Sequence, residues 1–201
     1  MLAATYLGDV EPYQQIEKYS CGAATLKAVL GHWGERVAER KLIKEIGIDP
    51  ESGSTAIQVA DAARRRGYNA NVRMFGSITE LGKVTSQDTP VILAIQSFTR
   101  PNQGHFVVAT AVKPGAVEIM DPNVKGNRRT LTHHELDARW KFRDRVGLII
   151  TPKRKQAHAH AHLGGLSWTP RTTAYAVAGA ILAIAGAVTG VVIWRRRKRT
   201  G

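Results

Sequence analysis

Cysteine is nearly absent from this chain, because Cys21 is the only one among 201 residues. An intramolecular disulfide is therefore impossible, which excludes a small secreted scaffold held together by disulfides. The length suits one domain with a tail and leaves no room for a second enzymatic domain, a transporter's membrane bundle or an ATPase. Stability must come from an apolar core, and 43% of the residues are hydrophobic.

Acidic residues are missing from the C-terminal part of the chain. All 16 lie at or before Asp144, whereas nine of the 29 basic residues lie from Lys153 onward. The net charge of +13 is therefore concentrated in the tail. Residues 1–150 also lack a stripe of Arg and Lys with interleaved aromatics, and the short basic run 64–66 is typical of a solvated helix end. The composition thus argues against a nucleic acid partner.

The chain shows no internal repeat, and its N-terminus lacks the basic and apolar segments of a signal peptide. A long uncharged run occurs only at 174–194, where 21 residues would span about 31 Å as a helix, the thickness of a bilayer core. Tyr175 and Trp194 lie at its ends and RRRKR follows it. We therefore predict a transmembrane helix. A buried core helix is disfavoured because the run has no polar face.

This run sets the expected domain organisation. Residues 1–150 form the folded domain, 151–173 a flexible basic and His-rich linker, 174–194 the membrane helix and 195–201 a basic tail. Three alternating histidines in the linker, His158, His160 and His162, could bind a metal loosely, but a polar spacer is favoured. We expect neither a metal nor a cofactor.

Within residues 1–150 the predicted helices precede most of the strands. Apolar residues at helical spacing predict helices from Cys21 after an N-cap at Ser20, over 37–46, and over 56–66 after a cap at Ser54 or Thr55. Strands are predicted over 70–74, 90–95, 106–112, 116–120 and 146–150, with a short helix over 132–139. The third and fourth strands are joined by a turn and should form an antiparallel hairpin. This order indicates an α+β fold.

Three residues in this domain could carry nucleophilic chemistry. Cys21 opens a helix, whose N-terminal partial charge favours thiolate over thiol. Among seven histidines, His105 opens an apolar strand beside Gly104 and so could face a cleft as a base. Asp121 closes the next strand, so the hairpin should place its carboxylate beside the imidazole. Read singly, each could equally be structural: a buried thiol, a core-edge histidine and a turn residue.

The ordered set of motifs resembles one family. Gln15, then Cys21-Gly22-Ala23-Ala24-Thr25-Leu26, is similar to the start of the bacteriocin-processing, double-glycine leader peptidases, which are papain-like cysteine proteases often fused to peptide-exporting ABC transporters. The similarity covers roughly 10–150. It continues through these segments: Gly53-Ser54-Thr55, Ala62-Ala63-Arg64-Arg65-Arg66-Gly67-Tyr68, Pro90-Val91-Ile92, His105-Phe106-Val107-Val108, Asp121-Pro122, and Glu135 with Trp140.

The resemblance implies a papain-like fold, with N-terminal helices packed on an antiparallel sheet, and a role for each residue. Cys21 would be the nucleophile and His105 the general base and acid. Asp121 would orient His105, and the Gln15 amide with the Cys21 N–H would form the oxyanion hole. The implied substrate is a precursor peptide with a Gly-Gly or Gly-Ala leader site. The chain departs from the family in its single anchor and in having no ATPase, so any exporter would be a separate partner.

Two alternatives stay open. The chain could perform other papain-like amide chemistry, such as acyl transfer or cleavage of a non-leader peptide, or it could be a membrane-tethered peptide-binding module without turnover. An intact Cys21 disfavours the second. Gly164-Gly165 in the linker could be a cleavage site in cis, but the residues before it lack an amphipathic leader helix.

The side of the membrane depends on two opposing arguments. The five positive charges after the predicted span would place the tail in the cytoplasm and the peptidase outside. Exporting the domain would need a signal sequence, which is not seen if Met1 is the true start. We give the missing signal more weight and predict a single-pass membrane protein whose peptidase faces the cytoplasm.

Overall fold

The structure, a computed structural model, describes residues 5–6 and 10–153. Five helices and seven strands occur in these residues. The helices are α1 (Cys21–His32), α2 (Glu39–Ile46), α3 (Ala56–Arg65), α4 (Ile78–Thr85) and α5 (His133–Lys141). The strands are β1 (Thr5–Tyr6), β2 (Tyr68–Met74), β3 (Val91–Gln96), β4 (Gly104–Lys113), β5 (Ala116–Met120), β6 (Arg128–Thr132) and β7 (Val146–Pro152).

The strands form one antiparallel sheet in the order β2-β7-β3-β4-β5-β6, with β1 paired to β4. The β4–β5 hairpin that the sequence predicts is present, and its two strands pair with Val112 opposite Val117 and Val108 opposite Met120. Gly115, which has a φ of 76°, supplies the left-handed residue that the connecting turn needs. The predicted α+β class with an antiparallel sheet is confirmed.

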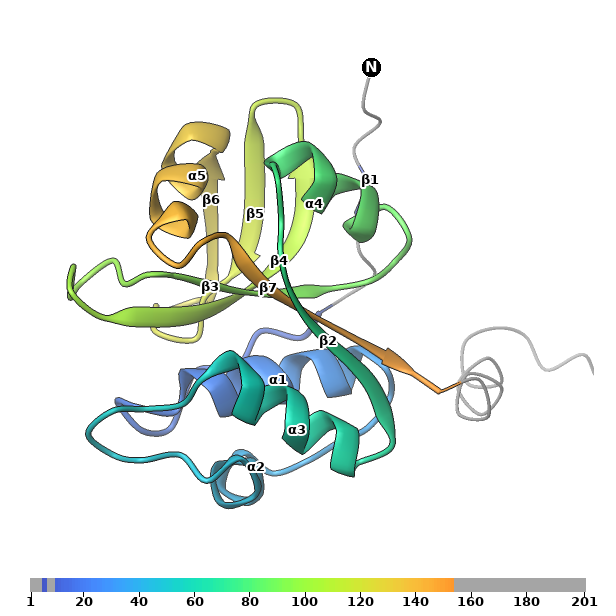
Figure 1. The fold of residues 1–201 in the computed structure, drawn as a ribbon, viewed down its shortest axis with the longest axis vertical. Helices are drawn as coiled ribbons and strands as arrows, with labels where there is room; N and C mark the ends of the chain where they lie inside the picture. The colour runs from blue at the N-terminus through green and yellow to red at the C-terminus, as the bar shows by residue number, and fades with distance from the viewer. Residues whose placement is uncertain (1–4, 7–9, 154–201) are drawn as a thin grey trace, which may run out of the picture. The chain divides into compact units, whose positions relative to one another are not determined.

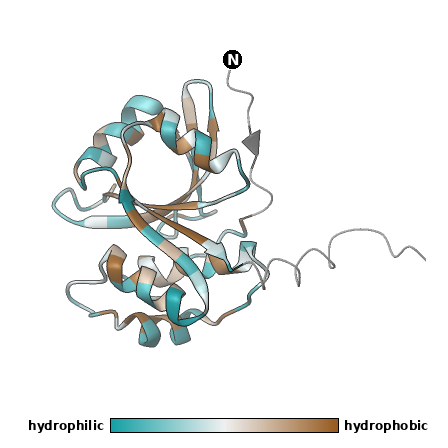
Figure 2. Cartoon of the chain, turned by 45° about the vertical axis from the view of Figure 1, so that its right-hand side comes forward, coloured by the Kyte–Doolittle hydropathy of each residue, from teal (hydrophilic) through white to brown (hydrophobic). Residues whose placement is uncertain are grey.

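Helices cover both faces of this sheet, so its central strands β3 and β4 are largely buried on two sides. In Figure 1, α1, α2 and α3 lie together on one side, while α4 and α5 lie on the other. Figure 2 shows that the central strands are largely hydrophobic. One core cluster joins α1–α3 to side chains such as Ile92, Val108 and Leu148. The second joins α4 and α5 to the alternate residues, including Leu93 and Val107.

Three elements were not predicted from the sequence: the two-residue strand β1, helix α4 and strand β6. Helix α4 follows β2 where only strands were expected, although Ser77 caps it by accepting a hydrogen bond from the Glu80 N–H at 3.2 Å. The spacing of Ser77 and Glu80 was the available signal. Strand β6 is polar and pairs with β5 alone, so it carries no apolar run that could mark it. It supplies an arginine to the candidate site described below.

The predicted cap at Ser20 is wrong in its chemistry, although α1 begins where expected. The Ser20 side chain makes no capping hydrogen bond to the helix. Its hydroxyl instead donates to the Glu39 Oε1 at 2.7 Å. The hydroxyl is drawn away because Glu39 is a buried carboxylate that needs donors. For α3, the cap is Thr55, which forms a capping box with Gln58.

The predicted membrane helix at 174–194, the linker beyond Lys153 and the basic tail lie outside the described residues. Within residues 5–6 and 10–153, every helix is too short or too polar to cross a bilayer. The anchor therefore stays a prediction.

Candidate active site

Cys21 is the first residue of α1 and is half-buried at the edge of a cleft of about 710 Å³. Its position at the helix start places the thiol in the region of positive partial charge. The backbone N–H groups in the first turn of a helix have no carbonyl partner within the helix, so that of Cys21 can face a ligand. The same residue thus offers a sulfur nucleophile and a backbone donor.

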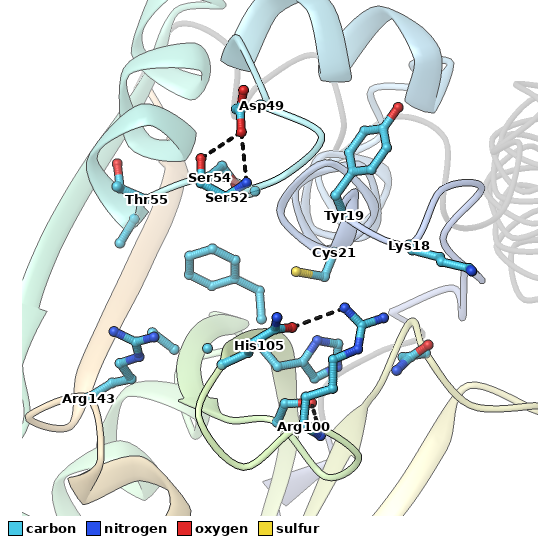
Figure 3. Close-up of a pocket in the computed structure, with 18 of the residues that line it drawn as sticks. Lys18, Tyr19, Cys21, Asp49, Ser52, Ser54, Thr55, Arg100, His105 and Arg143 are labelled. Atoms are coloured by element: carbon cyan, nitrogen blue, oxygen red, sulfur yellow. Dashed lines mark hydrogen bonds between the residues drawn. The ribbon is translucent and has the colours of Figure 1, made fainter.

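The cleft lies between two loop walls. One wall is formed by residues 49–56, between α2 and α3, and the other by residues 97–106, between β3 and β4, together with 142–146. Figure 3 shows Cys21 and His105 between these walls, with Asp49 and Ser54 on one side and Arg100 on the other. The opening is lined by polar and apolar side chains from segments far apart in the sequence.

His105 is the second residue of β4, and its side chain is 7% exposed. Its Nε2 lies 2.7 Å from the Asp121 Oδ1. Because a carboxylate only accepts, Nε2 carries the hydrogen, and Nδ1 remains for the Cys21 thiol, whose proximity helps to raise the pKa of the ring. The β4–β5 hairpin brings His105 and Asp121 together. Val108 pairs with Met120, so the start of β4, which holds His105, lies beside Asp121, the residue that follows β5.

The charges of this trio support one another. Burial opposes charging of the His105 imidazole, but hydrogen bonds to Asp121 and Cys21 and the negative charge of both outweigh burial and raise its pKa to about 9. Burial alone would raise the pKa of Asp121, yet its hydrogen bond to His105 and the charge of that ring hold the pKa below its usual value. The geometry therefore favours a protonated His105 imidazole beside an ionised Asp121 carboxylate.

Asp121 is fully buried, and both of its carboxylate oxygens have donors. Its Oδ1 accepts from the Asn123 N–H at 2.9 Å as well as from His105. Its Oδ2 accepts from the Arg129 Nε at 2.6 Å. A buried carboxylate is costly unless it is paired and hydrogen-bonded, and these contacts satisfy that condition.

Gln15 lines the same cleft as Cys21. Its backbone N–H donates to the Pro122 carbonyl at 3.0 Å, which fastens it to the residue after Asp121. Its Nε2 donates to the Glu17 carbonyl at 2.7 Å, and its Oε1 is buried without a partner. The amide group has two N–H donors, so one remains beyond the bond to Glu17. All four residues predicted from the sequence therefore meet at one place.

Glu39 was not predicted, but it holds the loop between Gln15 and Cys21. This residue of α2 is 4% exposed, and its Oε1 accepts from the Ile16 N–H at 3.0 Å and from the Ser20 hydroxyl at 2.7 Å. Its partners lie 23 and 19 residues away in the sequence. A charged residue in the first turn of a helix is usually exposed, so the sequence carried no signal of burial.

Gly22 allows close packing beside the nucleophile. A Cβ at this position would overlap the Ser54 Oγ and would lie 3.1 Å from the Val59 Cγ2. The Ser54 Oγ is itself buried without a partner. The glycine next to Cys21 therefore lets the loop of residues 49–56 approach the start of α1.

This arrangement can form and break an acyl thioester. A thiolate that faces a protonated imidazole can attack a carbonyl, and the imidazolium can then protonate the leaving amine. Among residues 5–6 and 10–153, no group of histidine, cysteine, aspartate and glutamate side chains is placed to hold a metal ion. An α+β fold with Cys, His and Asp in line at a cleft defines a papain-like cysteine peptidase.

Comparison with known proteins identifies the group within that class. Residues 9–155 match the peptidase C39 family, and the chain therefore belongs to this family of cysteine peptidases. The assigned catalytic roles of individual residues stay predictions.

The chain is also similar in sequence to a curated relative and in fold to two solved structures. The chain is 28% identical over 143 residues to the Lactococcin-G-processing and transport ATP-binding protein LagD of Lactococcus lactis subsp. lactis. That alignment covers 71% of this chain but only 18% of LagD. The peptidase domain of Streptococcus ComA, a bifunctional ABC transporter, superposes with a TM-score of 0.63 at 19% identity, covering 72% of this chain and all of that one.

The second structure is a double glycine motif protease from an AMS/PCAT transporter in complex with the leader peptide. It has a TM-score of 0.61 at 25% identity and covers 74% of this chain and 95% of that chain.

Proposed function

We propose that this chain cleaves precursor peptides after a double-glycine type leader site, as a peptidase tethered to a membrane by residues 174–194. The observation that carries the peptidase activity is the line of Cys21, His105 and Asp121 in a cleft of about 710 Å³. The substrate class is supported by the family and by the leader peptide held by the AMS/PCAT relative. The precursor is expected to be bacteriocin-like, because LagD processes Lactococcin-G.

The proposed reaction has two halves. The Cys21 thiolate attacks the carbonyl carbon of the scissile bond, and the His105 imidazolium gives its Nδ1 proton to the leaving amine as the C–N bond breaks. The acyl group then remains on sulfur as a thioester. His105, now neutral, takes a proton from water, the hydroxide attacks the thioester, and the thiolate leaves. Asp121 keeps the ring in the tautomer that both halves need.

The oxyanion of each tetrahedral intermediate would be held by two donors. One is the Cys21 backbone N–H at the start of α1, and the other is the second N–H of the Gln15 amide. A neutral amide suits this role because it does not compete for the His105 proton. The bond from Gln15 to the Glu17 carbonyl holds the amide in place at the cleft.

A peptide exporter is the further partner that we propose for this peptidase. The chain spans 18% of the length of LagD, whose name pairs processing with transport. A peptide exporter encoded nearby would supply the transport step, and a double-glycine precursor in the same neighbourhood would supply the substrate.

The cleavage test uses purified full-length protein in detergent and a synthetic precursor segment that contains Gly-Gly. We expect one cut after the second glycine, detected by mass spectrometry as two products with free carboxyl and amino ends. Cys21→Ala is the control for contaminating proteases. A matched peptide with Val-Val in place of Gly-Gly tests the site. Products joined to an added amine would point to acyl transfer, and tight binding without cleavage would point to a binding module.

The tether is tested separately. Wild-type protein should stay with membranes after alkaline carbonate extraction, whereas the double variant Leu182→Arg/Ile184→Arg should be released, since each arginine at a helix centre costs about 2.5–3.5 kcal/mol of insertion. We further propose that the peptidase faces the cytoplasm, where precursors are made. Protease added outside spheroplasts should then leave the domain intact, and digestion from outside would contradict this orientation.

A further inference from the structure

Asp121 is held from the side opposite His105 by an arginine that belongs to another strand. Arg129 lies on β6, directly opposite Ile119 of β5, and Asp121 follows two residues after Ile119. Residues two apart on a strand face the same side, so the Arg129 and Asp121 side chains meet diagonally. The Arg129 Nε donates to the Asp121 Oδ2 at 2.6 Å.

The Arg129 guanidinium is itself fixed by an aromatic ring. It stacks on Phe98 with its Cζ 4.2 Å from the ring centroid, and Arg139 of α5 stacks on the same ring at 4.3 Å. Phe98 comes from the loop between β3 and β4, which also forms a wall of the cleft. A planar guanidinium held by stacking offers its N–H groups in one direction, as a flexible ammonium does not.

We propose that Arg129 is a positioning residue for catalysis, which sets the plane of the Asp121 carboxylate. The inference rests on the proposed function for the roles of Cys21 and His105. With Oδ2 held by Arg129 and Oδ1 by the Asn123 N–H, the carboxylate cannot turn about its Cβ–Cγ bond. Oδ1 then accepts its second hydrogen bond from the His105 Nε2. The imidazole ring held in this way presents its Nδ1 to Cys21.

The charges of Asp121 and Arg129 support the same positioning role for the arginine. Asp121 is 0% exposed and carries the charge that helps to keep His105 protonated. The Arg129 side chain is 31% exposed, so it reaches the buried Asp121 Oδ2 from the protein surface. Removing it would leave Oδ2 buried without a donor, and the carboxylate would turn to find another one.

The test compares Arg129→Met with Arg129→Lys and with the matched control Arg139→Met. Arg139 contacts the same Phe98 ring, but its hydrogen bond goes to the Ser97 carbonyl at 3.4 Å. We expect Arg129→Met to lower kcat on the Gly-Gly peptide by about tenfold, the worth of a charge-assisted hydrogen bond, with KM unchanged. Arg129→Lys should recover part of the loss, and Arg139→Met should keep wild-type kcat.

A double-mutant cycle separates positioning from general structural support. In an Asp121→Asn background the arginine has no carboxylate to hold, so Arg129→Met should change kcat by less than about twofold. A merely structural arginine would cost the same factor in both backgrounds. An equal loss in both backgrounds, or a changed KM at constant kcat, would overturn the proposal.

A second readout does not depend on the substrate. The rate at which iodoacetamide alkylates Cys21 at pH 6 reports the thiolate, and it should fall in Arg129→Met with the same dependence on Asp121. If wild-type protein cleaves no Gly-Gly peptide, the proposed function fails, but the alkylation cycle still tests Arg129. Alkylation at the wild-type rate in Arg129→Met would overturn the positioning role.

Discussion

The substitution Asp121→Asn separates the charge of the carboxylate from its geometry. Two donors meet Oδ1, the His105 Nε2 and the Asn123 N–H, whereas only Arg129 meets Oδ2. The new amide should therefore place its oxygen at Oδ1, because the reverse would direct an NH₂ group at two donors. His105 then keeps its tautomer, and Arg129 turns towards solvent. The variant should remain active, although it has lost the negative charge.

The magnitude follows from the pKa of His105. Burial opposes charging, but the bonds and charges of Asp121 and Cys21 raise that pKa to about 9, against about 6.5 for a free imidazole. The protonated ring is needed for the leaving amine, so activity should fall as pH rises through about 9 in the wild type. Without the Asp121 charge the burial cost remains, and the alkaline limb should move down to between about 6.5 and 8.

The assay is kcat/KM on the Gly-Gly peptide from about pH 5 to about pH 10, with the free-enzyme pKa read from the alkaline limb. Asp121→Ala is the comparison: it removes the acceptor as well as the charge, so turnover should fall by about two or more orders of magnitude at every pH. An alkaline limb that stays at the wild-type pH in Asp121→Asn would show that the carboxylate charge does not support His105.

Other predictions concern the nucleophile, the oxyanion hole and the helix start. Cys21→Ala or His105→Ala should abolish cleavage with an unchanged circular dichroism spectrum, and surviving turnover would refute the enzyme mechanism. Gln15→Ala should lower kcat by about two orders of magnitude, as a lost oxyanion donor does; a change in KM alone would count against that role. Iodoacetamide should modify Cys21 readily near pH 6, and reaction only above about pH 8 would mark an inert thiol. Gly22→Ala should destabilise the domain by about 1–3 kcal/mol in urea titration, because its Cβ would overlap the Ser54 Oγ; unchanged stability would contradict this close packing.

The sequence predicted elements and residues wherever the signal was local. Helix α1 has an apolar stripe, the β4–β5 hairpin has a turn between two apolar runs, and Cys21 and His105 lie at the ends of such elements. Long polar segments gave no such signal. Strand β6 reads as Arg-Arg-Thr-Leu-Thr and is a strand only because β5 offers it a paired edge. Its existence depends on tertiary structure, and so does the position of Arg129.

Glu39 and Arg129 were not predicted as parts of the site, and the physical reason is the same for both. Residues that would contact the substrate carry reactive atoms, so their side-chain type is informative in the sequence. Glu39 and Arg129 carry charges that are normally solvated, and their roles appear only when a distant segment brings a donor or acceptor to them. Spacing along the chain cannot indicate such a meeting, because Arg129 is eight residues from Asp121 while Glu39 is 19 from Ser20.

These two charged residues lie at opposite ends of the site and belong to different layers. Glu39, on α2, holds the loop that carries Gln15 and ends at Cys21, and this loop packs with the helical layer. Arg129, on the sheet, holds Asp121 and through it His105. The nucleophile and its base therefore reach each other only where the two layers meet. Gln15 also crosses this boundary, because its backbone N–H bonds the Pro122 carbonyl next to Asp121 at 3.0 Å. A substitution that loosens the packing of α1 on β4 should thus lower activity before it unfolds the domain, since the catalytic geometry depends on that contact more steeply than the core does.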